Sequence, residues 1–282
     1  MFRDVAVRLS SVTLLAFGIA FPAAGQEEFT LRYKLDQGKS YRFIDTVNVK
    51  SSQEMMGREI KATSSVRAAT DVLASEVRSD GSTVLTLTPA AMSVIVKSPQ
   101  MDTTITPTEM IGKRSRTSIS PLGVATKREP IDSVKITGMT RTAAQRELVR
   151  FHVFPQAPVK AGGTWTATRG DTTDAMGSKV IMVTTMTYSV VGKEMHGAHQ
   201  ALKVSYKGKV TITGTGSMMG SDFFIEGSGT TGGTAFIDLA TGLSLLEDSS
   251  MDMESTIALT GQQKMTIPSS QSVVSHHLLA AE

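Results

Sequence analysis

The residues of this 282-residue chain that could do chemistry include histidines grouped in one short stretch. His196 and His199 flank a Gly-Ala dipeptide, and Glu194 precedes them. A zinc site normally needs three or four ligands that converge on one point. Two histidines and one glutamate on a single short stretch do not make a complete ligand set. The Gly-Ala linker is typical of a turn between strands. We therefore expect turn histidines here and no metal site.

A glycine-rich stretch matches the spacing of a dinucleotide-binding loop, because Gly227, Gly229 and Gly232 follow the G-x-G-x-x-G pattern. That loop must open a helix, whose N-terminus holds the pyrophosphate, whereas residues 234–237 are predicted to form a strand. The chain has no G-x-S-x-G motif. Carboxylates such as Asp252 and Glu254 alternate along a predicted strand. The sequence therefore predicts no cofactor and no enzyme, with a hydrolase as the remote alternative.

Methionine is unusually frequent, with 16 residues, and several lie beside glycine at expected hairpin turns: Met55-Met56-Gly57, Met176-Gly177 and Met218-Met219-Gly220. Thioethers adapt to varied apolar surfaces and also suit copper(I). Three interpretations stay open: filler in a glycine-rich sheet, apolar docking or ligand binding, and a copper site. The candidate ligand-binding residues are Met182, Met186, Phe223, Ile225, Met251 and Met253.

The first 25 residues have the features of a secretory signal. Arg3 and Arg8 precede a short apolar run, and small residues precede an expected cut ahead of Gln26. The later segments lack a run long enough to span a bilayer as a helix. The chain has no cysteine, which excludes disulfides and a lipid-modified cysteine. We expect an exported protein, periplasmic or at the cell surface.

The charge pattern argues against nucleic acid as a partner. The formal net charge is +3, and the densest basic cluster, Lys113-Arg114 with Arg116, has no interleaved aromatic residues.

The remaining chain is expected to be all-β and mainly antiparallel. Phe29, Leu31, Tyr33 and Leu35 alternate with polar residues, as in a strand buried on one face. The same alternation continues through Val49, with Asp45 as the exception. A single helix is predicted at about 140–153, ended by the prolines that follow it.

Landmarks in the first half return in the second half. Gly38 and Tyr41 return as Gly162 and Trp165, the Gly81 turn as Gly197, and the Gly123 turn as Gly242. We therefore predict two duplicated, strongly curved β-sheet units, half-barrel or sandwich-like, joined by one α-helix. The expected boundaries are 1–25 for the signal peptide, 26–138 and 159–282 for the two units, and 139–158 for the helix and proline linker. Whether the units share one sheet stays open.

Several segments together resemble a family of uncharacterised bacterial secreted and lipoprotein-like β-proteins. They are 31–41, the Met55-Met56-Gly57 turn, 158–165, 214–220 and 260–268. This resemblance carries no assigned activity. More coarsely, the layout is similar to envelope lipoprotein carriers, which hold acyl chains in a concave sheet. The first hypothesis is thus a cell-envelope protein that binds a lipid or other apolar ligand; the alternative is a scaffold or interaction module with an envelope protein as partner.

Overall fold

The computed structural model describes residues 27–126, 128–134, 149–175, 178–218, 221–260 and 264–280. All the regular secondary structure in these ranges is β-strand. The strands are β1 (Glu28–Phe29), β2 (Ser40–Met55), β3 (Arg58–Val77), β4 (Thr83–Ser98), β5 (Met101–Ile105), β6 (Ser115–Ile119), β7 (Glu129–Pro130), β8 (Val159–Lys160), β9 (Thr164–Ala175), β10 (Ser178–His196), β11 (His199–Met218), β12 (Ser221–Asp238), β13 (Ser244–Thr260) and β14 (Met265–Leu279).

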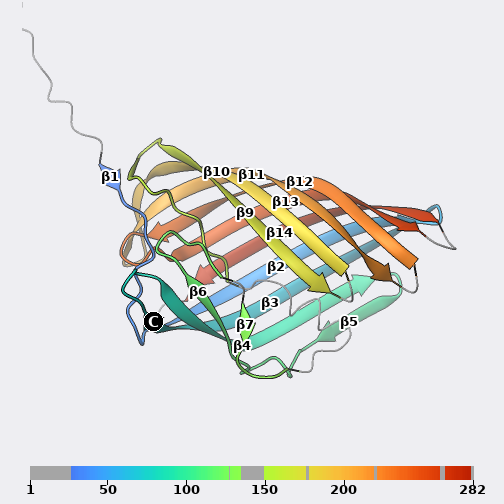
Figure 1. Cartoon of the computed structure of the whole chain (residues 1–282), viewed down its shortest axis with the longest axis horizontal. Coiled ribbons are helices and arrows are strands. Elements are labelled where there is room, and N and C mark those ends of the chain that lie inside the picture. The colour runs from blue at the N-terminus through green and yellow to red at the C-terminus, as the bar shows by residue number, and fades with distance from the viewer. Residues whose placement is uncertain are drawn as a thin grey trace, which may run out of the picture.

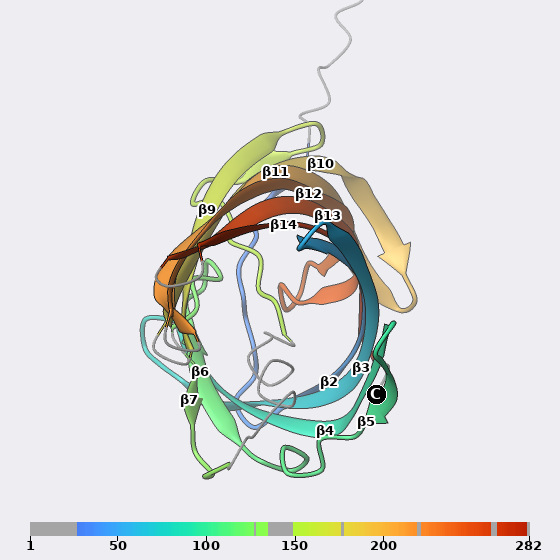
Figure 2. The ribbon, with the colours of Figure 1, turned by 90° about the vertical axis from the view of Figure 1, so that its right-hand side faces the viewer.

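Twelve strands form one antiparallel sheet in the order β7-β6-β4-β3-β2-β14-β13-β12-β11-β10-β9, with β5 paired to β4. The strands of the N-terminal half therefore lie on one side and those of the C-terminal half on the other, and β2 and β14 join them. The sheet curls around an interior that holds segments of the chain (Figures 1 and 2). In the described part of the chain its two edges, β7 and β9, are not paired with each other. The two expected units thus share one continuous, open sheet.

The two faces of the sheet differ in composition, as β13 illustrates. Its inward side chains include Met251, Met253, Ile257 and Leu259, while its outward ones are mostly polar: Asp248, Ser250, Asp252, Glu254, Thr256 and Thr260. Successive side chains of a strand point to opposite faces, so one face can pack while the other meets solvent. We call these the inner face, which carries the hydrophobic core, and the outer face.

Inward glycines allow the sheet to bend sharply. A Cβ added at Gly208, Gly227 or Gly229 would lie 2.4, 2.5 or 2.2 Å from a backbone oxygen of the neighbouring strand. Only glycine permits so close an approach. These inward glycines therefore let neighbouring strands approach closely where the sheet curls.

Turns close at the glycines that the two halves have in common. Gly38, Gly81 and Gly123 have positive φ angles, and so do Gly162, Gly197 and Gly242. The hydrogen bonds also correspond: Gly38 N donates to Ala74 O as Gly162 N donates to Val190 O. Positive φ favours glycine because it has no Cβ. The matched turns accord with duplication, which itself stays a prediction.

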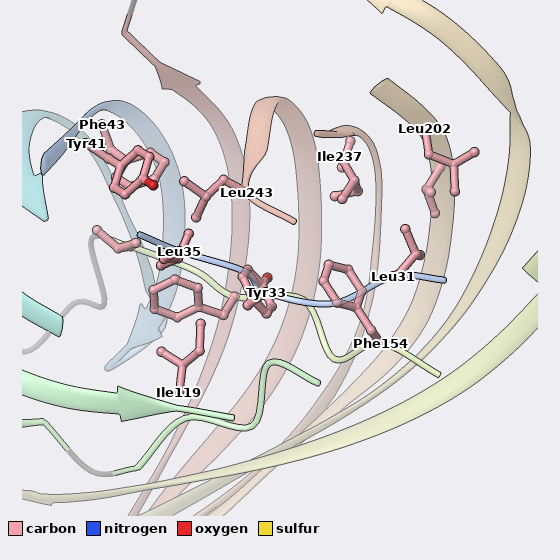
Figure 3. Packing of buried hydrophobic residues seen from close by; sticks show 14 of the residues in the cluster. Leu31, Tyr33, Leu35, Tyr41, Phe43, Ile119, Phe154, Leu202, Ile237 and Leu243 are labelled. Carbon is pink, nitrogen blue, oxygen red and sulfur yellow. The ribbon is translucent and has the colours of Figure 1, made fainter. Parts of the chain in front are cut away.

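The segment from Phe29 to Leu35 lies inside the curled sheet (Figure 3). Its four alternating apolar residues are buried, as predicted. Only β1 forms a ladder, with β8, so the expected strand over 28–35 is wrong beyond Phe29. The late turn of each half holds this segment instead, because Tyr33 N donates to Pro121 O and Lys34 N to Thr241 O, each at 2.9 Å. The N-terminal segment thereby connects both halves to the main hydrophobic core.

The predicted joining helix is not seen. Residues 149–158 are described and form no helix, and residues 135–148 lie outside the described residues. The apolar residues Val149, Phe151 and Phe154 are buried in the main core as an extended segment. Residues 149–153, the last part of the predicted helix, are therefore not helical. None of the described residues belongs to a helix long and apolar enough to cross a membrane.

Candidate functional site

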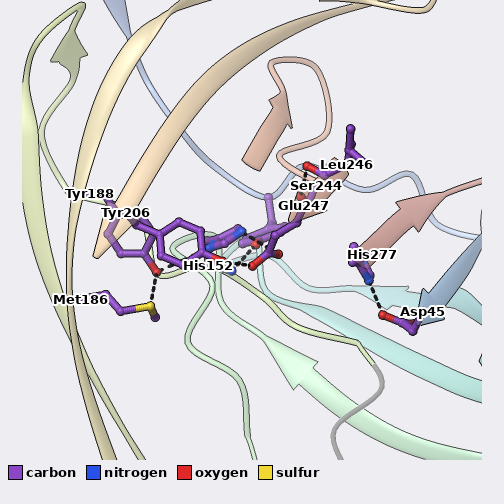
Figure 4. Close-up of polar contacts among 10 residues, drawn as sticks. Asp45, His152, Met186, Tyr188, Tyr206, Ser244, Leu246, Glu247 and His277 are labelled. Atoms are coloured by element: carbon purple, nitrogen blue, oxygen red, sulfur yellow. Dashed lines mark hydrogen bonds and ion pairs between the residues drawn. The ribbon is translucent and has the colours of Figure 1, made fainter. Parts of the chain in front are cut away.

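A row of ionisable side chains crosses the inner face at the join between the two halves. The strand register places Glu247 of β13 opposite His277 of β14, and His277 opposite Asp45 of β2. All three are buried. Directly opposed residues in an antiparallel sheet have Cβ atoms about 4.5–5.5 Å apart, so the three groups are neighbours. Figure 4 shows this row with the side chains that contact it.

His277 and Asp45 form a close buried pair. His277 Nδ1 lies 2.7 Å from Asp45 Oδ1, which fits an N–H donated to the carboxylate. The ring of Phe43 stacks on the imidazole at 4.8 Å. The other polar atoms of the pair, His277 Nε2 and Asp45 Oδ2, are buried with no hydrogen-bond partner among the described residues. Each side chain of the pair therefore has one polar atom in a hydrogen bond and one without a partner among the described residues.

Glu247 is held from two directions. His152, on the interior segment that follows residue 148, places Nε2 3.2 Å from Glu247 Oε2, and Tyr206 of β11 donates its hydroxyl to Oε1. The His152 contact has the distance of an ion pair without hydrogen-bond geometry. Burial alone would raise the pKa of the Glu247 carboxyl, but the charge of His152 and the Tyr206 hydrogen bond outweigh it and lower the pKa to about 2.

A glycine lets Tyr206 reach across a strand. Tyr206 lies opposite Gly233 of β12, which in turn lies opposite Ser249 of β13. A Cβ on Gly233 would lie 2.6 Å from the Tyr206 hydroxyl oxygen. The phenol ring therefore passes over Gly233 to Glu247.

Further aromatic rings surround His152. Its Nδ1 lies 3.5 Å from the Tyr188 hydroxyl, and its backbone N–H donates to the Tyr33 hydroxyl at 2.8 Å. Burial raises the pKa of Tyr33, Tyr188 and Tyr206, so these phenols stay neutral. Trp165, the counterpart of Tyr41 in the predicted repeat, stacks on Tyr188 at 4.7 Å and donates its indole N–H to Val153 O. It is only partly buried.

The described residues contain no group of three or more side chains that could hold a metal ion. His196 is half-buried beside Phe236, and exposed His199 lies 3.7 Å from Asp238. They lie opposite each other at the turn between β10 and β11, as expected for turn histidines.

All six predicted ligand-binding residues lie on the inner face and are half-buried there. They are spread over three strands: Met182 and Met186 on β10, Phe223 and Ile225 on β12, and Met251 and Met253 on β13. Phe223 lies opposite Leu259, and Ile225 opposite Ile257. Met186 also accepts a weak hydrogen bond from the Tyr188 hydroxyl at 3.6 Å. Apolar side chains therefore lie along the inner face from the ionisable row toward the far ends of the strands, interspersed with inward polar residues such as Ser255 and Gln271.

The outer face of the sheet is hollowed over several strands. Two open depressions of about 900 and 650 Å³ adjoin one another over β2, β3 and β11–β14. Their shared lining includes Ser52, Ser228, Glu254 and Ser270, which are outward polar residues. They do not coincide with the predicted ligand-binding residues, of which only Met253 contributes to the smaller one.

Sequence reasoning did not identify the ionisable row. His152, Tyr206, Glu247 and His277 carry no motif, and their partners are distant in the chain. One signal was available: Asp45 interrupts the inward apolar series Tyr41, Phe43, Val47 and Val49. A polar residue at such a position needs a buried partner.

Comparisons with known proteins do not assign this chain to a family. No family model and no curated protein matches the chain. Among solved structures, Pseudomonas aeruginosa OpdQ matches 86% of this chain and 100% of its own at 8% identity, with a TM-score of 0.29. An outer membrane channel from Pseudomonas putida F1 matches 92% of this chain and 99% of its own at 8% identity, with a TM-score of 0.21. The translocator domain of the autotransporter NalP from Neisseria meningitidis matches 86% of this chain and 89% of its own at 8% identity, with a TM-score of 0.20. Likenesses this low carry no argument about this chain.

Proposed function

We propose that this chain is an exported, non-enzymatic protein of the cell envelope that binds a lipid acyl chain or similar apolar ligand on the inner face of its curved sheet. One observation carries the proposal: half-buried apolar side chains follow the inner face, while the outer face is mainly polar. When a ligand covers the exposed part of these apolar side chains, the burial favours binding by about 25 cal/mol per Å².

The inner face is long enough for an extended chain. Along β13, the stretch from Glu247 to Leu259 spans about 40 Å at roughly 3.3 Å per residue. Met251, Met253, Ile257 and Leu259 face inward along it. Flexible thioethers suit a ligand that lacks a rigid shape.

The ionisable row is enclosed within the protein. Glu247, His277 and Asp45 are each less than 10% exposed. General acid–base catalysis requires the proton-transfer group within hydrogen-bond reach of the substrate. Side chains this enclosed serve the packing of the sheet, so we assign no reaction to them.

The test is to purify the protein from its own cell envelope, extract any lipid, and record the native mass. We expect a bound acyl species and displacement of an apolar naphthalene-based fluorescent probe by long-chain lipids. Phe223→Ser should weaken probe binding, because Phe223 faces inward. Phe224→Ser is the matched control, because Phe224 is its outward neighbour and is 42% exposed. A lipid-free protein that binds no probe, or equal losses in both variants, would contradict the proposal.

A second candidate, an envelope interaction module, rests on the β2–β3 hairpin tip. Met56 is 82% exposed there and has a φ of 52°. An exposed methionine at a rigid turn is suited to contact a partner protein. If no ligand co-purifies, affinity capture with the wild-type chain and with Met56→Ser tests this candidate.

A further inference from the structure

Four buried ionisable groups form a line of alternating charge type across the middle of the molecule. His152 contacts Glu247, Glu247 lies opposite His277 in the sheet register, and His277 contacts Asp45. Buried apolar residues flank the line on both sides: Val204 and Ala235 toward β11, and Ala68 and Met92 toward β4. Water therefore screens these charges little.

The line connects parts of the chain that are otherwise separate. The His277–Asp45 contact crosses the β14–β2 join between the two halves of the sheet. The His152–Glu247 contact fixes the interior segment 149–155 to β13. That segment also supplies Val153 O to the Trp165 indole and Phe154 N–H to Leu122 O. A change of charge in the line would thus act on both the join and the interior segment.

We propose that His152–Glu247–His277–Asp45 is a proton-held latch, which is closed while both imidazoles carry a proton and loosens as the pH rises and they lose it. With both imidazoles protonated, each carboxylate has a cationic neighbour and the four charges cancel. With both neutral, two carboxylates remain buried in the same row. Removing one partner of a buried ion pair leaves an uncompensated charge, which is strongly unfavourable.

Other groups around the latch modify this balance without replacing it. Tyr206 donates to Glu247, and Arg150 on the interior segment lowers the pKa of that carboxyl through its charge. Tyr188 faces His152 from β10 and stays neutral. In the described structure Asp45 has an ion-pair contact with His277 and with none of these three residues.

The sheet contains its own control. His276 Nδ1 lies 2.7 Å from Asp248 Oδ1, the same distance as in the buried pair, but on the outer face with side chains 49% and 66% exposed. If His276 loses its charge, water solvates the exposed Asp248 carboxylate in its place. Loss of this exposed contact should leave the fold unaffected.

The experiment uses the full chain between about pH 5.5 and about pH 8.5, the range in which an imidazole ordinarily loses its proton. Trp165 is the only tryptophan, so its emission reports the interior segment. Amide exchange at Phe43–Val47 and Ser275–Leu279, corrected for the intrinsic rate, reports the join. We expect exchange there to accelerate about tenfold on raising the pH, with a shift of Trp165 emission.

His152→Gln and His277→Gln should each reduce this pH response, whereas His276→Gln should retain it in full. If either glutamine variant fails to fold, the imidazole nitrogen resonances of the wild-type protein, titrated by NMR alongside amide exchange, show whether the join loosens as His277 loses its proton. Constant exchange and emission across the range, or loss of the response in His276→Gln, would overturn the proposal. Neither outcome depends on whether an apolar ligand binds.

Discussion

His277 and Asp45 lie 232 positions apart in the chain, yet their side chains meet at 2.7 Å across the strands that join the two halves of the sheet. The adjacent residue His276 makes a contact of equal length with Asp248 on the opposite face. The two pairs differ in exposure: 8% and 12% for the buried pair, against 49% and 66% for the outer one. The two pairs should therefore contribute very different amounts to the free energy of unfolding.

Asp45→Asn should destabilise the protein by about 3–5 kcal/mol, because it leaves the buried His277 without its anion. Asp248→Asn should cost at most about 1 kcal/mol, since exposed ion pairs contribute little. Urea unfolding at neutral pH compares the two. Equal effects would show that burial does not decide the strength of these pairs.

Glu247 should give the protein acid-sensitive stability. Its folded pKa of about 2 lies below the ordinary glutamate value of 4.5, so its contribution is complete above about pH 4.5 and is lost as the pH falls toward 2. A shift of this size corresponds to roughly 3 kcal/mol. Unfolding free energies measured across this window should fall more steeply for the wild type than for Glu247→Gln. Parallel pH profiles would contradict the assignment.

Gly233→Ala should destabilise the protein by about 1–3 kcal/mol, because the new methyl group overlaps the Tyr206 hydroxyl and the Asp248 carbonyl oxygen. Gly170→Ala on β9 is the control, since a Cβ there meets nothing within 4 Å. Thermal unfolding of both variants measures the difference. Equal stability of the two would mean that Tyr206 does not need to pass over Gly233.

Trp165→Ala should cost about 3 kcal/mol, at the lower end for a large aromatic residue, because the ring is only partly buried. Its loss removes the stacking on Tyr188 and the hydrogen bond to Val153 O. Chemical denaturation followed by circular dichroism measures the change. An unaltered midpoint and slope would refute its role as a core anchor.

Met56→Asn should stabilise the β2–β3 hairpin by up to about 1 kcal/mol. Met56 and Gly57 have φ angles of 52° and 71°, and asparagine tolerates this region better than methionine does. The midpoint of thermal unfolding should rise in the variant. A fall would show that the methionine side chain has a structural contact that outweighs the backbone preference.

Local patterns in the sequence determined much of the architecture. Alternating apolar residues identified the buried side of segment 29–35, and glycines such as Gly38 and Gly162 marked turns with positive φ. These features follow from one residue and its neighbours, so they are readable without the fold. The same reasoning placed Met182, Met186, Phe223, Ile225, Met251 and Met253 on strands, and the structure puts all six on the inner face.

Only the tertiary structure decided how distant segments meet. Of the helix predicted at about 140–153, residues 149–153 are described and are not helical, and Phe151 lies buried inside the curled sheet together with Phe154. Asp45 stood out as a polar residue at an inward position, but nothing local could identify His277 as its partner. That pairing depends on the register of β14 against β2, which the packing of the whole sheet sets.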